Sequence, residues 1–198
     1  AVQMKRRYED MVSGEAKRVY FGTFHAIFFT ILKYAYHYTA DNIIHDDVKR
    51  QLLRELVNKE EIEIQDENDF LNELESEISK VKGERLDLRH YYSPNCPGES
   101  FRRIYSGYQG MLESRRLLDF DDMLVYCYEL LKAREDIRQM WQKQYPYILI
   151  DEFQDINKVQ YDIVKMLALP KNNLFIVGDD DQSIYGFRGA KPDIMKRF

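Results

Sequence analysis

Three carboxylates follow a short apolar stretch near residue 150. Tyr147 to Ile150 are aromatic or aliphatic, Asp151 and Glu152 come directly after them, and Asp155 follows three residues later. A buried strand that ends in acids can serve a metal-bound phosphate, because one carboxylate can hold Mg²⁺ while another orients and deprotonates an attacking water. Acids are also common where strands stop, so the same pair could simply begin a loop, with Glu152 capping the next helix.

A second group of polar and aromatic residues follows the next apolar run, in "VGDDDQSIYGFRGA" at 177–190. Tyr185 and Phe187 lie in a stretch too rich in glycine for a packed helix. Such rings suit stacking on nucleobases, each stack contributing about 1–3 kcal/mol. Gln182 can donate and accept hydrogen bonds and so could sense a γ-phosphate. Arg188 could bind a phosphate or pair with the neighbouring acids.

The elements around these residues alternate between strand and helix. We expect strands over 147–151 and 173–178, separated by a helix over about 157–168, and an earlier strand over 18–24. Strands separated by helices of about 10–15 residues indicate a parallel α/β sheet. The ligand site of such a sheet lies at the carboxyl ends of its strands, so the two polar groups should meet there.

The remaining sequence predicts helices. Val2 to Met11 repeat apolar residues at helical spacing, and Thr23 can cap a helix over about 24–37. From 39 to 116 the pattern contains helical faces without strand signals. Asp119 can cap a helix that runs to about 133, with Asp122 in its first turn, and we expect this pair to have no catalytic role.

Composition excludes some classes of protein and leaves others open. The net charge of −5 argues against a nucleic-acid partner, yet residues 60–77 hold nine acids without a lysine or arginine, and the rest is mildly basic. We interpret the acidic helix around 66–82 as a solvated face. No apolar run reaches the ~20 residues of a membrane span. Cys96 and Cys127 have no metal or disulfide spacing. We therefore expect a cytoplasmic protein without a membrane partner.

Five segments, taken in order, carry a resemblance to a known family. "LIDEFQD" and the 177–190 segment resemble motifs II and III of UvrD/Rep-type superfamily 1 DNA helicases. "FGTFHAIFFTILK" (21–33) is similar to motif Ib of that family, and "LLDFDDML" (117–124) to its D-F-D-D-L segment. "AVQMKRR" (1–7) is similar to the tail of motif Ia. The resemblance covers nearly the whole chain.

The resemblance implies an α/β fold, an incomplete RecA-like (P-loop NTPase) parallel sheet with an inserted all-α subdomain. Residues 1–38 would be the first part of the motor domain, 39–116 the inserted helical subdomain, and 117–198 the second part of the motor domain.

The resemblance also implies roles on the ATP side. Asp151 would bind Mg²⁺, and Glu152 would act as the general base for ATP hydrolysis. Gln182 would contact the γ-phosphate and report its loss, and Arg188 would link the nucleotide to the DNA site.

On the DNA side, Tyr185 and Phe187 would line the track of the single strand. Thr23 and His25 would touch the DNA backbone at the start of a helix. Two simpler interpretations remain for the last pair: Thr23 could be only a helix cap and His25 only a packed helical residue.

One family feature is absent from the sequence. No G-x-x-x-x-G-K-[ST] loop occurs, and none of the nine glycines precedes a lysine. In the family that loop lies upstream of motif Ia, so we expect an excised fragment that lacks ATPase activity on its own.

The parent would be an ATP-dependent 3′→5′ DNA helicase or translocase. It would use ATP and Mg²⁺ and act on single-stranded DNA and duplex junctions. Two alternatives stay open: a non-catalytic module that binds single-stranded DNA or docks a protein, and a Mg²⁺-dependent nuclease using the acids at 151–155 and 179–181.

Overall fold

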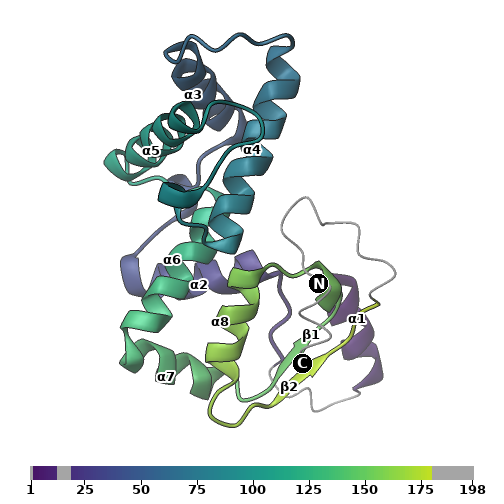
Figure 1. The fold of residues 1–198 in the computed structure, drawn as a ribbon. Coiled ribbons are helices and arrows are strands. Elements are labelled where there is room, and N and C mark those ends of the chain that lie inside the picture. The colour runs from purple at the N-terminus through teal and green to yellow at the C-terminus, as the bar shows by residue number, and fades with distance from the viewer. Residues whose placement is uncertain (1, 13–18, 180–198) are drawn as a thin grey trace.

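Helices make up most of the molecule. The computed structural model describes residues 2–12 and 19–179, and the arrangement of the elements is shown in Figure 1. The helices are α1 (Val2–Met11), α2 (Phe24–Tyr36), α3 (Asp46–Asn58), α4 (Glu67–Glu84), α5 (Gly98–Ser114), α6 (Phe120–Ala133), α7 (Glu135–Gln144) and α8 (Lys158–Ala168). The strands are β1 (Ile148–Ile150) and β2 (Leu174–Ile176), and short 3₁₀ turns cover Ala40–Asn42, Leu88–His90 and Phe153–Asp155.

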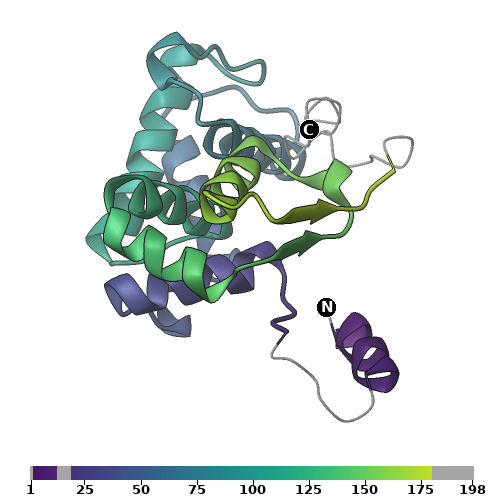
Figure 2. The same ribbon diagram turned by 90° about the horizontal axis from the view of Figure 1, so that it is seen from below.

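The two strands lie side by side and run parallel, as both views show (Figure 1 and Figure 2). Ile148 pairs with Leu174 and Ile150 with Ile176, and α8 forms the connection between the strands. The predicted parallel strand–helix–strand unit is confirmed. Side chains alternate across it: Ile150 is buried, whereas Leu149 and Phe175 on the opposite face are 71% and 62% exposed.

A first hydrophobic core lies on the buried side of the sheet. It is built from α2, α6, α7 and α8, and the apolar stripe of α2 enters it at helical spacing. Capping boxes begin two of these helices: Asp119 with Asp122 on α6, and Asn157 with Gln160 on α8. The fully buried members include Phe28, Ile31, Leu32, Leu124, Cys127, Leu131, Val159 and Ile163.

A second hydrophobic core joins α3, α4 and α5, which Figure 1 shows at the opposite end of the molecule from the strands. Its members come only from residues 44–112. Its largest fully buried side chains are Leu53, Leu71, Leu74, Ile78, Phe101, Ile104, Tyr108 and Leu112. Helix α4 also contacts α6 and α8, and Lys82 near its C-terminal end bonds to α6.

The strand predicted over 18–24 is wrong where the structure describes it. Residues 19–23 form no strand. Within the described ranges no neighbouring strand pairs with their backbone, and an extended segment belongs to a sheet only when such a partner is present. Tyr20 instead packs edge-on against Tyr145, with ring centroids 5.9 Å apart. Residue 18 lies outside the described residues.

The first helix forms as predicted, but its apolar face is not buried. Val2, Met4 and Met11 are 69%, 46% and 76% exposed, and Figure 2 shows α1 standing apart from the sheet. Tyr8 contacts Phe21, with 5.6 Å between ring centroids. Within residues 2–12 and 19–179, no helix combines the length and apolarity that crossing a membrane requires.

The interpretation of the acidic helix as a solvated face is wrong at Glu77. This side chain is 5% exposed, and its Oε2 accepts hydrogen bonds from Ser93 Oγ at 3.0 Å and Asn95 Nδ2 at 2.9 Å. It therefore anchors the loop that precedes α5. Several other acids of the segment pair with bases of α3 and α5, namely Glu75 with Lys49 and Arg50, Glu67 with Arg54, and Glu60 with Arg103.

Candidate functional site

The acids after β1 lie on an exposed turn of the chain. Asp151 and Glu152 are both exposed, and Glu152 adopts the left-handed conformation with φ 54°. A non-glycine residue in this region is uncommon and indicates a local constraint. The backbone N–H of Glu152 donates to Oδ1 of Asp151 at 3.1 Å. The carboxylate of Asp151 thus bonds to the backbone of its own turn.

The loop after β2 meets this turn. The backbone N–H of Val177 donates to the carbonyl of Ile150 at 2.8 Å, and that of Phe153 donates to the carbonyl of Val177 at 2.9 Å. The two strand ends, far apart in sequence, thus form one continuous surface, as expected at the carboxyl edge of a parallel sheet.

Gln154 links the same two segments through its side chain. Its Nε2 donates to Oε2 of Glu152 at 2.6 Å, and its Oε1 accepts from the backbone N–H of Asp179 at 3.0 Å. The side chain is 1% exposed. The sequence analysis did not single out this residue, although a glutamine within an acidic turn was a visible signal.

Gly178 makes this close approach possible. A Cβ at this position would lie 2.4 Å from Oε1 of Gln154 and 3.1 Å from the backbone nitrogen of Phe153. No side chain fits there without movement of the neighbouring turn.

The third acid, Asp155, is half-buried behind the pair. Its Oδ1 is buried and has no hydrogen-bond partner among the described residues. Burial, followed by the charge of Glu152, raises the pKa of this carboxyl. An oxygen of this kind can accept from a bound water or ligand.

The donor set at the end of β1 consists of hard oxygens, which suits Mg²⁺. In the part of the chain that the structure describes, no group of three or more His, Cys, Asp and Glu side chains converges to hold a metal ion. Mg²⁺ typically binds through one or two carboxylates, with water and phosphate oxygens completing its shell. Asp151 and Glu152 fit that kind of site.

Thr23 and His25 lie at the start of α2. Oγ1 of Thr23 accepts from the backbone N–H of Ala26 at 3.3 Å, so Thr23 is the helix cap that the simpler interpretation predicts. His25 is half-buried and meets Phe120 edge-on, with ring centroids 5.4 Å apart. Phe120, at the start of α6, is 52% exposed. The remaining predicted site residues, Gln182, Tyr185, Phe187 and Arg188, lie outside the described residues.

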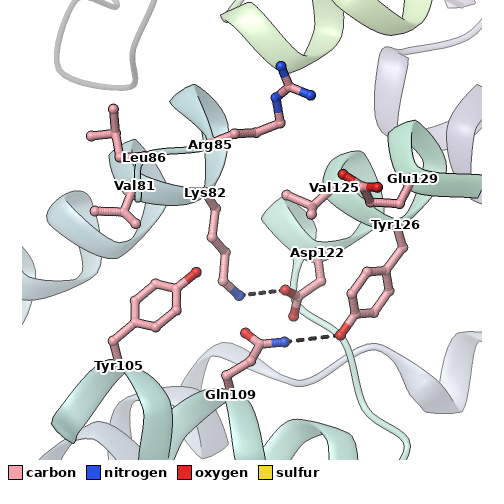
Figure 3. A pocket seen from close by; sticks show the side chains of 10 residues that line it. All are labelled: Val81, Lys82, Arg85, Leu86, Tyr105, Gln109, Asp122, Val125, Tyr126 and Glu129. Atoms are coloured by element: carbon pink, nitrogen blue, oxygen red, sulfur yellow. Dashed lines mark hydrogen bonds and ion pairs between the residues drawn. The ribbon is translucent and has the colours of Figure 1, made fainter. Parts of the chain in front are cut away.

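The D-F-D-D segment begins α6, as predicted, and also makes an ionic contact that the sequence analysis missed. Nζ of Lys82 lies 2.8 Å from Oδ2 of Asp119 and 2.6 Å from Oδ1 of Asp122. Tyr108 donates its hydroxyl hydrogen to Oδ2 of Asp119 at 3.0 Å. The three ionic side chains are at most 3% exposed. Figure 3 shows Lys82 reaching from α4 toward Asp122 on α6.

Burial and the charges of the neighbouring side chains shift the pKa values of all three ionic groups in this cluster. Burial, reinforced by the charge of Asp119, raises the pKa of Asp122 to about 6 despite Lys82. Burial also opposes ionisation of Asp119, but Lys82 outweighs it and lowers the pKa of that carboxyl. The two carboxylates likewise overcome burial at Lys82 and raise the pKa of its ammonium group. The cluster therefore contains a firmly charged lysine.

A parallel strand–helix–strand unit with acids and a glycine at its carboxyl edge is compatible with an incomplete α/β fold, a class in which ligand sites lie at that edge. A family model described as the UvrD/REP helicase N-terminal domain matches residues 1–198, and the chain belongs to this family.

Individual relatives agree with this assignment. YjcD of Bacillus subtilis (strain 168) is 34% identical over 210 residues, which cover 99% of this chain and 26% of YjcD. The ATP-dependent DNA helicase PcrA of Leuconostoc citreum is 32% identical over 100% of this chain and 27% of that protein. PcrA of Staphylococcus aureus (strain Mu50) is 31% identical over 96% and 27%. The chain thus spans about a quarter of the length of these relatives.

Proposed function

We propose that this chain is part of the motor of an ATP-dependent DNA helicase or translocase that moves 3′→5′ on single-stranded DNA and acts at duplex junctions. The strands and the helices of the first core would belong to an incomplete RecA-like domain. Residues 39–116, which supply the second core, would be its inserted helical subdomain. One observation carries the proposal most strongly: Asp151 and Glu152 share one sheet edge with the segment 177–179.

The ATP side of the proposed mechanism is the one that the resemblance implies, and the geometry of that edge supports it for Asp151 and Glu152. Asp151 would hold Mg²⁺, which neutralises charge on the phosphates when bound. Glu152 would orient the attacking water and accept its proton. Both side chains are exposed and their carboxylates have different partners, the backbone N–H of Glu152 for Asp151 and the amide of Gln154 for Glu152, which supports separate roles. As the resemblance implies, Gln182 would contact the γ-phosphate and Arg188 would link the nucleotide to the DNA site.

The DNA side would use different elements. Thr23 and His25 stand at the N-terminus of α2, where backbone N–H groups favour phosphates. Tyr185 and Phe187 would stack on bases. Because Thr23 already caps α2, its hydroxyl would serve DNA only in addition to that role.

The test compares this chain with the longest open reading frame that contains it. The longer protein should hydrolyse ATP in a manner stimulated by single-stranded DNA. Glu152→Gln should lower kcat by about 100-fold or more while ATP binding persists. Glu113→Gln, at an exposed glutamate of α5, is the matched control. The isolated chain, which has no phosphate-loop sequence, should show no turnover.

Other outcomes would replace the proposal. Salt-sensitive binding of single-stranded DNA by the longer protein without ATP turnover would favour a non-catalytic binding module. DNA cleavage with Mg²⁺ in the absence of ATP would favour a nuclease. Turnover by the longer protein that survives Glu152→Gln would refute the role of that residue.

A further inference from the structure

The buried amide of Gln154 makes two directed hydrogen bonds, one to each strand-end segment. It donates to a carboxylate oxygen of Glu152 at 2.6 Å and accepts from the backbone N–H of Asp179 at 3.0 Å. These partners assign the nitrogen and the oxygen of the amide, because a carboxylate can only accept a hydrogen bond and a backbone N–H can only donate one. Both halves of the amide are therefore used.

A carboxamide of this length is the side chain that satisfies both partners. Glutamate would place a second carboxylate against Glu152, and leucine would leave the backbone N–H of Asp179 without this acceptor. Asparagine is one methylene shorter. The space is fitted to the glutamine, since a Cβ on Gly178 would lie 2.4 Å from its Oε1.

The contact to Glu152 controls a residue that is otherwise exposed to solvent. An exposed glutamate samples several rotamers, and fixing one of them removes conformational freedom before any reaction takes place. The hydrogen bond engages Oε2 of Glu152, which orients the whole carboxylate. The same amide is bonded to Asp179, three residues before Gln182 in the sequence.

We propose that Gln154 is a positioning residue that orients the carboxylate of Glu152 and couples it to the segment beginning at Asp179. This inference rests on the proposed function, because it assigns Gln154 a part in the water activation by Glu152. A shift of the 179 segment would pull on the amide and move the carboxylate, so the two loops would change geometry together.

The kinetic test uses the longer open reading frame with ATP and single-stranded DNA. Gln154→Leu should lower kcat by about 10- to 100-fold with little change in the KM for ATP, the pattern of a misplaced catalytic group. Gln154→Glu, which conserves size, should be no better. Gln139→Leu, at an exposed glutamine of α7, should retain kcat within about twofold.

A double-mutant cycle separates positioning from a general structural effect. Once Glu152→Gln has removed the carboxylate, adding Gln154→Leu should cost less than about threefold further in kcat. Full additivity of the two losses would overturn the proposal, as would a Gln154→Leu enzyme whose kcat stays within about twofold of the parent.

A measurement without turnover distinguishes failure of this inference from failure of the proposed function. In this chain, amide hydrogen exchange at Asp179 should speed up by about tenfold or more in Gln154→Leu and stay unchanged in Gln139→Leu. Unchanged exchange at Asp179 would overturn the coupling whatever the enzymology shows. Faster exchange in a protein that lacks ATPase activity would sink the proposed function and the catalytic part of this inference, and would leave only the link between the loops.

Discussion

Replacing Lys82 by methionine should destabilise the chain severely. Methionine keeps most of the aliphatic length of lysine, so the main loss is the ammonium group that sits 2.8 Å and 2.6 Å from two buried carboxylates. Removing one partner of a buried ionic group leaves uncompensated charge, which costs about 3–5 kcal/mol. For a urea slope of about 2 kcal/mol per M, the unfolding midpoint should fall by about 2 M.

The assay is equilibrium urea unfolding, followed by far-UV circular dichroism and by the fluorescence of Trp141. This residue is the one tryptophan of the sequence and lies in the first core. The lysine comes from α4 of the second core and its acids from α6 of the first, so both signals should shift. Lys80→Met, at an exposed position of the same helix, is the control and should change stability by less than about 0.5 kcal/mol.

The same cluster determines how the loss of stability in Lys82→Met depends on pH. The pKa of Asp122 is about 6 in the folded state, above the ~3.9 of an unfolded aspartate. Between these values the native state binds more protons than the unfolded state, so the contribution of Asp122 to stability rises as the pH falls. Without Lys82, the pKa of Asp122 should rise further, and the pKa of Asp119, which Lys82 lowers in the parent, should rise as well. The loss of unfolding free energy caused by Lys82→Met should therefore become smaller as the pH falls from 7 through 6.

Two results would refute this reasoning. Lys82→Met could unfold like Lys80→Met, which would mean that the carboxylates find water or other partners in its absence. Alternatively, the triple variant Lys82→Met/Asp119→Asn/Asp122→Asn could be as unstable as the single variant. If uncompensated charge causes the loss, the triple variant should recover at least half of it, because asparagine still caps a helix and carries no charge.

Four further substitutions test local packing and one helix cap. Gly178→Ala should cost about 1–3 kcal/mol in urea unfolding, because its Cβ would collide with Gln154. Gly107→Ala should stay within about 1 kcal/mol of the parent, because its Cβ would come too close only to Cδ2 of the Leu56 side chain, at 2.8 Å, and alanine favours the helix of α5. A larger loss of stability in Gly107→Ala than in Gly178→Ala would contradict the close approach at Gly178. Asn157→Ala should lower stability by about 1 kcal/mol by removing the cap of α8, and Asn157→Asp should restore it in thermal melts; equal melts for all three proteins would exclude the cap.

Elements whose signals are local could be predicted from the sequence. Thr23 and Asp119 mark the starts of α2 and α6 because a cap and the N–H that it accepts are three residues apart. The paired strands were predictable for a similar reason: short apolar runs separated by one helix leave few alternatives to a parallel pair. The prediction of a strand over 18–24 was wrong because a strand forms only against a neighbouring strand, and the residue types at 19–23 do not show whether such a neighbour exists.

Features that depend on distant partners could not be predicted. Lys82 follows Ile78 by one helical turn and so falls on the buried stripe of α4, which was a signal of an unusual lysine. Its partners, however, lie 37 and 40 residues away on α6. Glu77 was taken for a solvated acid because its partners Ser93 and Asn95 belong to a loop whose path the sequence does not define.

The candidate site depends on both kinds of information, and Gln154 shows how they combine. Residue types at a strand end, together with the family resemblance, made Asp151 and Glu152 candidates, although acids are also common where strands stop. The glutamine two residues later could only be understood once the fold had brought Asp179 within 3.0 Å of it. Gly178 is the sign of that contact in the sequence, because only a residue without a Cβ leaves room for the side chain of Gln154 beside the backbone. In a parallel sheet, a glycine after one strand is therefore a reason to look for a buried polar side chain after its neighbour.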